Sequence, residues 1–111
     1  MIIEKLITID IGHKNYSLDQ ALVELEVKVS ECIFNSNVKA VKIVTGHGTG
    51  ALKNAVREWC AQQEGRFREV IPGEGFDIFN PLVVNLREDC DFPFDKDLGA
   101  NNKAVTYIWF W

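Results

Sequence analysis

The feature that most constrains the fold is a glycine-rich segment, TGHGTG (residues 45–50), between two apolar segments of different periodicity. Before it, residues 38–45 (VKAVKIVT) are apolar and valine-rich, which predicts a strand. After it, apolar residues recur at helical spacing, which predicts a helix over residues 50–63, with Thr49 as its N-cap. A strand, a glycine-rich turn and a helix in this order are typical of α/β proteins.

Two further strand–helix units flank this segment. Residues 2–11 are rich in isoleucine and predict a strand, and a helix follows from Ser17 to about residue 35. Gln20 stands three residues after Ser17, the spacing of a capping box. Residues 67–71 (FREVI) predict a third strand, and residues 104–111 are apolar on both faces, as in a strand covered on both sides.

Residues 72–103 are rich in prolines and glycines and predict an irregular insertion before the last strand. Within it, LVVNL (82–86) reads as a short extra strand and the acidic residues 87–97 as an exposed loop. The predicted order is therefore β-α-β-α-β-β in one domain over residues 1–111. We expect an α/β two-layer sandwich with a mixed, mostly parallel four-stranded sheet.

Charge is distributed unevenly along the 111 residues, whose formal net charge is -4. The acidic total argues weakly against a nucleic-acid partner. Only residues 38–70 carry net positive charge, with six basic and three acidic side chains, and they contain the glycine-rich segment. Any nucleic-acid site is therefore expected there.

The three cysteines, Cys32, Cys60 and Cys90, have no CxxC spacing, so the sequence predicts neither a disulfide framework nor a zinc site. Cys32 and Cys60 fall on the apolar faces of predicted helices, as buried thiols in a reducing cytoplasm do. The sequence contains no signal peptide and no apolar run near the ~20 residues that span a membrane. We expect a cytoplasmic protein without a cofactor and without a membrane partner.

The glycine-rich segment has the chemistry of an anion site. Glycines let backbone N–H groups approach a phosphate, and the following helix points its positive end there. The segment is neither a Walker A motif nor a dinucleotide fingerprint, because its glycines follow the pattern GxGxG. Lys53 and Arg57 are four residues apart, which places both cations on one face of the predicted helix. The predicted nucleic-acid-binding residues are Thr45, Gly46, Gly48, Thr49, Gly50, Lys53 and Arg57.

The only two histidines, His13 and His47, both follow predicted strands. In a parallel sheet such loops lie at the carboxyl ends, where α/β sheets bind ligands. Histidine suits acid–base chemistry at neutral pH, so Asp10, His13 and His47 are the predicted catalytic residues, with Asp10 orienting His13. A two-metal nuclease needs several converging carboxylates, and Asp10 is the only one expected near this loop.

Residues 41–59 (VKIVTGHGTGALKNAVREW) resemble the signature of the small MutS-related (Smr) domain family, in which a strand, an HGxGTG or TGxG loop and a helix beginning Ala-Leu follow one another. SLDQAL (17–22) resembles the start of the family's first helix, and AVTYIWF its closing strand. The resemblance covers about residues 6–64. It implies a fold similar to the C-terminal domain of translation initiation factor three. It also implies an activity that nicks DNA or cleaves RNA. Several members of the family act on messenger RNA at stalled ribosomes.

One position departs from the family pattern. The family's first strand ends in LDxH, whereas this chain has Asp10-Ile11-Gly12-His13, with glycine in the histidine's place. Three functions stay open at this point. The first is a nuclease that acts without metal on RNA or DNA, the second a nucleic-acid-binding module without activity, and the third a protein-interaction domain.

Overall fold

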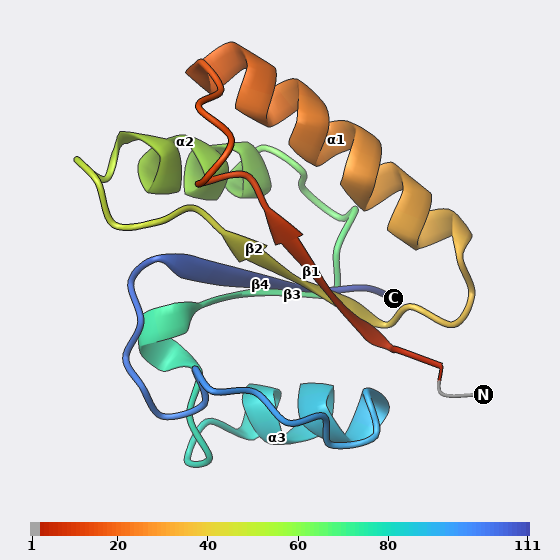
Figure 1. Cartoon of the computed structure of the whole chain (residues 1–111). Helices are drawn as coiled ribbons and strands as arrows, with labels where there is room; N and C mark the ends of the chain where they lie inside the picture. Colours follow the sequence, from red (N-terminus) through yellow and green to blue (C-terminus); the bar gives the residue numbers. More distant parts are fainter. Residues whose placement is uncertain (1–2) are drawn as a thin grey trace.

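The computed structural model describes residues 3–111, which form four strands, three α-helices and one 3₁₀ turn (Figure 1). Ile2, the first residue of the predicted first strand, lies outside the described residues. The elements are β1 (Leu6–Asp10), α1 (Leu18–Phe34), β2 (Ala40–Val44), α2 (Ala51–Ala61), β3 (Glu69–Pro72), η1 (Gly73–Gly75), α3 (Pro81–Asp89) and β4 (Val105–Trp109).

The four strands form one mixed sheet in the order β1-β2-β4-β3. β1 and β2 are parallel, and β4 runs antiparallel to both β2 and β3. The predicted mixed sheet is confirmed, since β1, β2 and β3 share one direction. All five residues of β4 are buried, as expected for a central strand. The carboxyl ends of β1 and β2 therefore meet the start of β4 at one end of the sheet.

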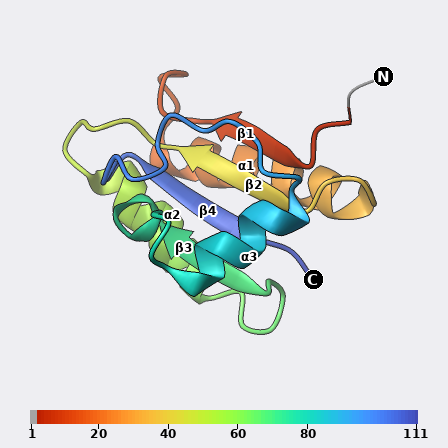
Figure 2. The same cartoon turned by 90° about the horizontal axis from the view of Figure 1, so that it is seen from below.

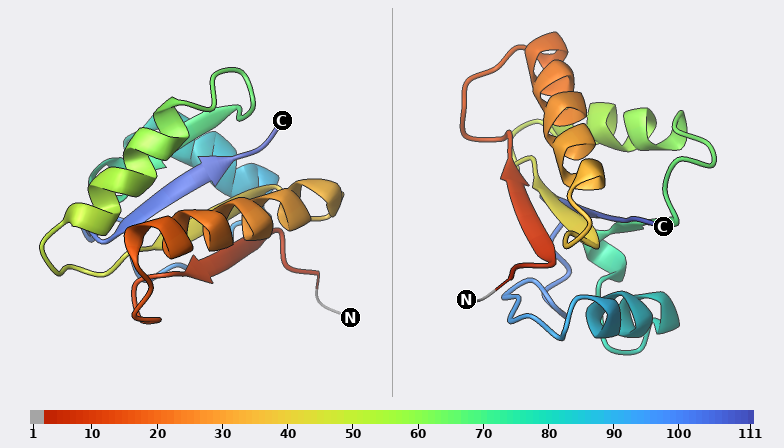
Figure 3. Two further views of the ribbon diagram at one scale, coloured as in Figure 1. Left: turned by 90° about the horizontal axis from the view of Figure 1, so that it is seen from above. Right: turned by 90° about the vertical axis from the view of Figure 1, so that its right-hand side faces the viewer.

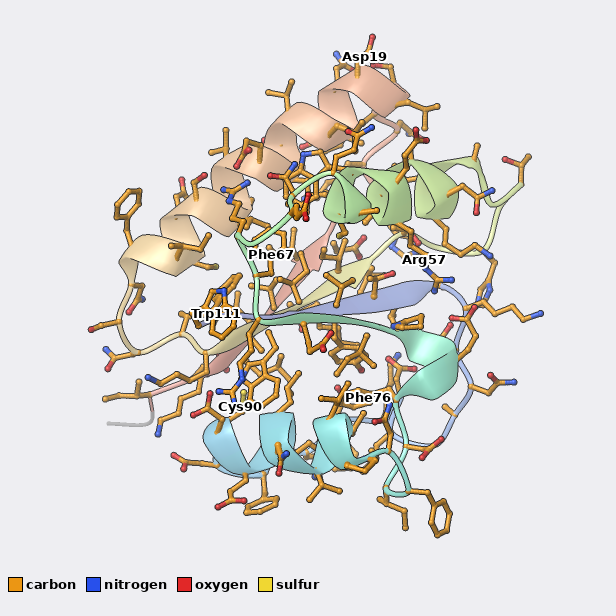
Figure 4. All side chains as sticks on the ribbon, turned by 180° about the vertical axis from the view of Figure 1, so that it is seen from behind. Asp19, Arg57, Phe67, Phe76, Cys90 and Trp111 are labelled. Carbon is orange, nitrogen blue, oxygen red and sulfur yellow. The ribbon has the colours of Figure 1, made fainter. Side chains whose placement is uncertain are left out.

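Two apolar cores lie on opposite faces of the sheet. On one face α1 and α2 cover the side chains of β1, β2 and β4, with Phe67 among them (Figure 4). On the other face α3 packs through Val83, Leu86 and Cys90 (Figures 2 and 4). Phe76 stacks there on Tyr107, with ring centroids 3.7 Å apart. The sheet and the α1–α2 layer are as predicted, and α3 adds a third layer.

Residues 81–89 form a helix, so the prediction of a strand at 82–86 was wrong. Asn80 is the N-cap and its side chain accepts the N–H of Leu82, while Pro81 occupies the first helical turn. Proline is well suited there because that N–H has no partner within a helix. Pro81 belongs to the proline- and glycine-rich segment predicted to be irregular, but after Asn80 it marks the start of a helix.

The prediction that residues 87–97 form an exposed loop was wrong in part. The side chains of Asp95 and Asp97 are 3% and 7% exposed, and both form ion pairs with the buried Lys42 of β2. Tyr107 of β4 also donates to Asp95. The segment thus crosses the α3 face of the sheet and is tied to it by charge (Figure 2).

Helix α1 begins as the sequence predicts. Ser17 accepts the N–H of Gln20, and the Gln20 side chain accepts the N–H of Ser17, which completes the capping box. Cys32, Cys60 and Cys90 are free thiols, and burial raises the pKa of both Cys60 and Cys90 to about 12. Within residues 3–111, no helix combines the length and the apolar character needed to cross a membrane.

Candidate nucleic-acid interface

The glycine-rich segment forms an exposed loop from the end of β2 to the start of α2. Gly46, Gly48 and Gly50 have positive φ values of 72°, 32° and 83°, which residues with a side chain rarely adopt. The N-cap of α2 is Gly50 rather than the predicted Thr49, which was wrong by one residue. Thr49 still assists, because its hydroxyl accepts the N–H of Ala51 at 3.3 Å. The backbone therefore turns sharply at the positive end of α2.

Two lysines line a hollow of about 200 Å³ beside this loop, Lys53 from α2 and Lys103 from the segment before β4. Neither lysine forms an ion pair within residues 3–111. Lys103 was not among the predicted site residues, because nothing in the sequence near it marks a site. It reaches the loop only because β4 is antiparallel to β2.

Arg57 extends from α2 towards the start of β4, a central strand, and towards η1 (Figure 4). Its guanidinium donates to both carboxylate oxygens of Glu74 at 2.6 and 3.0 Å, and to the hydroxyl of Thr106. These hydrogen bonds lower the pKa of Glu74 to about 2. Arg57 and Lys53 share a helix face, as the spacing predicts, but Arg57 is already neutralised.

Asp10 and His13 are in contact at the end of β1, with 2.8 Å between Asp10 Oδ2 and His13 Nδ1. Asp10 Oδ1 also accepts the N–H of Gly12 at 3.0 Å. Partial burial opposes the charge of Asp10, but the hydrogen bonds from His13 and Gly12 outweigh it, so its pKa lies below the ordinary value. An ionised Asp10 holds the proton of neutral His13 on Nδ1 and leaves Nε2 free to accept one.

The ends of β1 and β2 are pressed together at Gly12. A Cβ atom at Gly12 would lie 2.5 Å from the carbonyl carbon of Thr45, closer than real contacts allow. A histidine at the family's position is therefore incompatible with this backbone. The turn instead presents its histidine one residue later, where it still contacts Asp10.

The turn and the glycine-rich loop lie at the same end of the sheet (Figures 1 and 3). A second hollow of about 250 Å³ joins them, since it is lined by Gly12 as well as by residues 45–53. His47, at the exposed tip of the loop, lines both hollows, whereas His13 lines neither. The structure thus brings the two loops together at one end of the sheet, with His13 outside the shared hollow.

Thr45 is buried, unlike the rest of the loop, and fixes its first residue. Its N–H and its hydroxyl both donate to the carbonyl of Ala104, at 2.8 and 3.0 Å. The N–H of Ala104 binds Asn102 Oδ1, and Asn102 Nδ2 donates to Asp97, the partner of Lys42. These contacts connect the buried ion cluster to the glycine-rich loop and position Lys103 between them.

The fold and this end of the sheet define a small α/β protein with an exposed glycine-rich loop at the start of a helix. A protein-family comparison matches the Smr domain over residues 12–77, more than half of the chain. The chain belongs to the Smr domain family, whose members are in general nucleic-acid-binding modules of the endonuclease type.

A solved structure agrees on the fold. The chain is similar to the Smr domain of Thermus thermophilus MutS2, with a TM-score of 0.60 and 17% identity, over 94% of this chain and 96% of that one. The comparison with curated proteins gives no match.

Proposed function

We propose that this Smr domain binds single-stranded RNA at the glycine-rich loop and cleaves it by acid–base chemistry that needs no metal. The observation that carries the proposal is the hydrogen-bonded pair of Asp10 and His13 beside a glycine-rich loop whose two lysines form no ion pair within residues 3–111. The N–H groups of Gly46, Gly48 and Gly50, with the Thr49 hydroxyl, would receive the phosphate. Lys53 and Lys103 would neutralise it, and Thr45 and Arg57 would hold the loop and α2 in place.

The proposed reaction has one proton acceptor and one proton donor. His13 Nε2 takes the proton of a ribose 2′-hydroxyl, whose oxygen then bonds to the adjacent phosphorus. The bond from phosphorus to the 5′-oxygen of the next nucleotide breaks, and His47 protonates that oxygen. The products are a 2′,3′-cyclic phosphate and a 5′-hydroxyl. Asp10 acts through His13, because it fixes the tautomer and stabilises the cation that forms.

One observation favours a second candidate, a module that binds nucleic acid without cleaving it. The backbone at Gly12 leaves no room for a side chain where the family has its histidine. His13 then serves only to close the turn through Asp10. In this case binding persists in full and cleavage is not observed.

The test is cleavage of end-labelled single-stranded RNA and of matched DNA, with and without EDTA. Wild type is compared with Asp10→Asn, His13→Ala, His47→Ala and Lys53→Ala. Lys96→Ala is the control, since this exposed lysine lies on the α3 side of the sheet. We expect RNA cleavage that survives EDTA, ends in a cyclic phosphate and is lost in both histidine variants.

Binding is measured in parallel against salt concentration. If Lys53→Ala removes one phosphate contact, the negative slope of log K against log salt becomes less steep by about 0.7 for a single strand. Salt-dependent binding without cleavage would favour the second candidate. Binding that is independent of both salt and Lys53 would exclude a phosphate site at this loop.

A further inference from the structure

A groove of about 440 Å³ runs along the outer side of β1, beneath α1. Its floor is β1, which is the edge strand of the sheet, and its walls are the turn after β1 and one side of α1. Asp10, the partner of His13, lines this groove, while Gly12 of the same turn lines the hollow at the glycine-rich loop. An RNA strand held at the loop can thus continue across the turn after β1 into the groove.

Tyr16 gives the groove an aromatic wall. Its side chain lines the groove and also a neighbouring hollow on α1 that contains Val23. The residue is 38% exposed, so part of its side chain is accessible. Exposed aromatic rings beside a cationic loop are the usual stacking platforms for unpaired bases.

The charges in the groove favour a base over a phosphate. Lys14 and Lys28 are opposed by Asp10, Glu24 and Glu31, so the groove does not carry net positive charge. Lys28 lies 3.8 Å from Glu24, a loose ion pair that leaves carboxylate oxygens free to accept hydrogen bonds. Carboxylates accept from exocyclic amino groups such as N4 of cytosine, whereas uracil offers a carbonyl oxygen at that position.

We propose that this groove binds one unpaired nucleobase that carries an exocyclic amino group, on the nucleotide next to the phosphate at the glycine-rich loop. This inference rests on the proposed function, because the phosphate contact brings the base to the groove. Tyr16 stacks on the base, and Glu24 and Glu31 select it by its amino group.

The test is binding of short oligocytidylate and oligouridylate RNA, whose bases differ at position 4, an amino group against a carbonyl oxygen, and in the hydrogen that uracil carries on N3. Fluorescence anisotropy gives affinities for the wild type and for Tyr16→Ala, Tyr16→Phe, Lys53→Ala and the double variant Glu24→Gln with Glu31→Gln. Phe79→Ala is the matched control, since Phe79 is an 87% exposed aromatic residue next to α3. Circular dichroism confirms that each variant is folded.

We expect Tyr16→Ala to weaken oligocytidylate binding by roughly 5- to 100-fold, the loss typical of one stacked base. Tyr16→Phe and Phe79→Ala keep the wild-type affinity. The wild type prefers cytidylate by about tenfold, the order of one well-formed hydrogen-bonded base contact, and the double glutamine variant loses this preference.

Equal binding of the two oligonucleotides, with no effect of Tyr16→Ala, overturns the inference. If Lys53→Ala still weakens binding in that case, the phosphate site stands without the base site. If the wild-type protein binds neither oligonucleotide, both the base site and the proposed phosphate site are overturned.

Discussion

Gly12 and Thr45 are in backbone contact so close that a single added carbon at Gly12 would lie 2.5 Å from the Thr45 carbonyl carbon. The contact joins the ends of two parallel strands, since the N–H of Ile11 donates to the carbonyl of Val44 just before it. Gly12 is therefore a packing requirement of this chain, and the shift of the histidine to position 13 follows from it.

We expect Gly12→Ala to lower the free energy of unfolding by about 1–3 kcal/mol, because backbone atoms on both sides must move apart. Gly75→Ala is the matched control, since the nearest atom to its Cβ is 3.8 Å away. Urea denaturation measures both. Equal stability of the two variants would contradict the contact, and Gly12→His is expected to destabilise without restoring or raising activity.

The buried ion cluster predicts a large effect of removing its cation. Lys42→Ala leaves Asp95 and Asp97 buried without their partner, which costs about 3–5 kcal/mol of stability. The control is Lys28→Ala, whose exposed pair with Glu24 is worth at most about 0.5 kcal/mol. Chemical denaturation of both variants at neutral pH makes the comparison. A small effect of Lys42→Ala would show that the cluster opens to water.

Glu74 predicts how stability changes in acid. Its pKa is about 2 in the folded chain, below the ordinary 4.5, because Arg57 donates to both of its oxygens. A lowered pKa stabilises the fold at every pH above the ordinary pKa of 4.5. This contribution is lost as the pH falls from 4.5 towards 2. We expect Glu74→Gln to reduce stability at pH 7 by ~1–3 kcal/mol and to flatten this part of the pH profile.

The control for Glu74 is Glu58→Gln, an exposed glutamate on α2 next to Arg57 in sequence. Its pH profile is expected to match the wild type. Thermal unfolding between pH 7 and pH 2 distinguishes the two. An unchanged acid slope in Glu74→Gln would mean that Arg57 does not hold this carboxylate in solution.

Asn102 is expected to act on RNA binding through Lys103. Asn102→Ala frees the segment before Ala104, so Lys103 loses its fixed place beside the loop. Affinity for RNA then falls about two- to fivefold, as for an exposed ion pair of ~0.5–1 kcal/mol. The double variant with Lys103→Ala is expected to bind no worse than Lys103→Ala alone. Additive losses in this double-mutant cycle would contradict the positioning role, since a general loss of stability does not depend on Lys103.

Local signals in the sequence predict much of the fold. The capping box of Ser17 and Gln20, the glycine-rich loop and the uniformly apolar last strand depend on neighbouring residues, and all three are confirmed. Helix α3 was missed because Asn80 and Pro81 favour turns and helix starts alike. Only the apolar spacing of Val83, Leu86 and Cys90 distinguishes the two.

The predictions that failed or were incomplete depend on distant partners. Asp95 read as solvated because its cation, Lys42, lies 53 residues earlier in the chain. Lys103 was missed because it approaches the loop only through the antiparallel pairing of Val44 with Val105. Arg57 was placed on the correct helix face, but its partner Glu74 is on another element. A pattern within one element does not reveal which residues of another element neutralise it.

The order of the strands has a consequence for how the chain folds during synthesis. β4 lies between β2 and β3 in the sheet, yet it follows both in sequence. β3 pairs with β4, so until residues 105–109 have emerged from the ribosome it has no strand to join. Thr45, the first residue of the glycine-rich loop, likewise cannot form its hydrogen bonds until Ala104 has been synthesised. Contacts between such distant residues form slowly. The proposed RNA-binding site of a growing chain is thus expected to stay incomplete until β4 is in place.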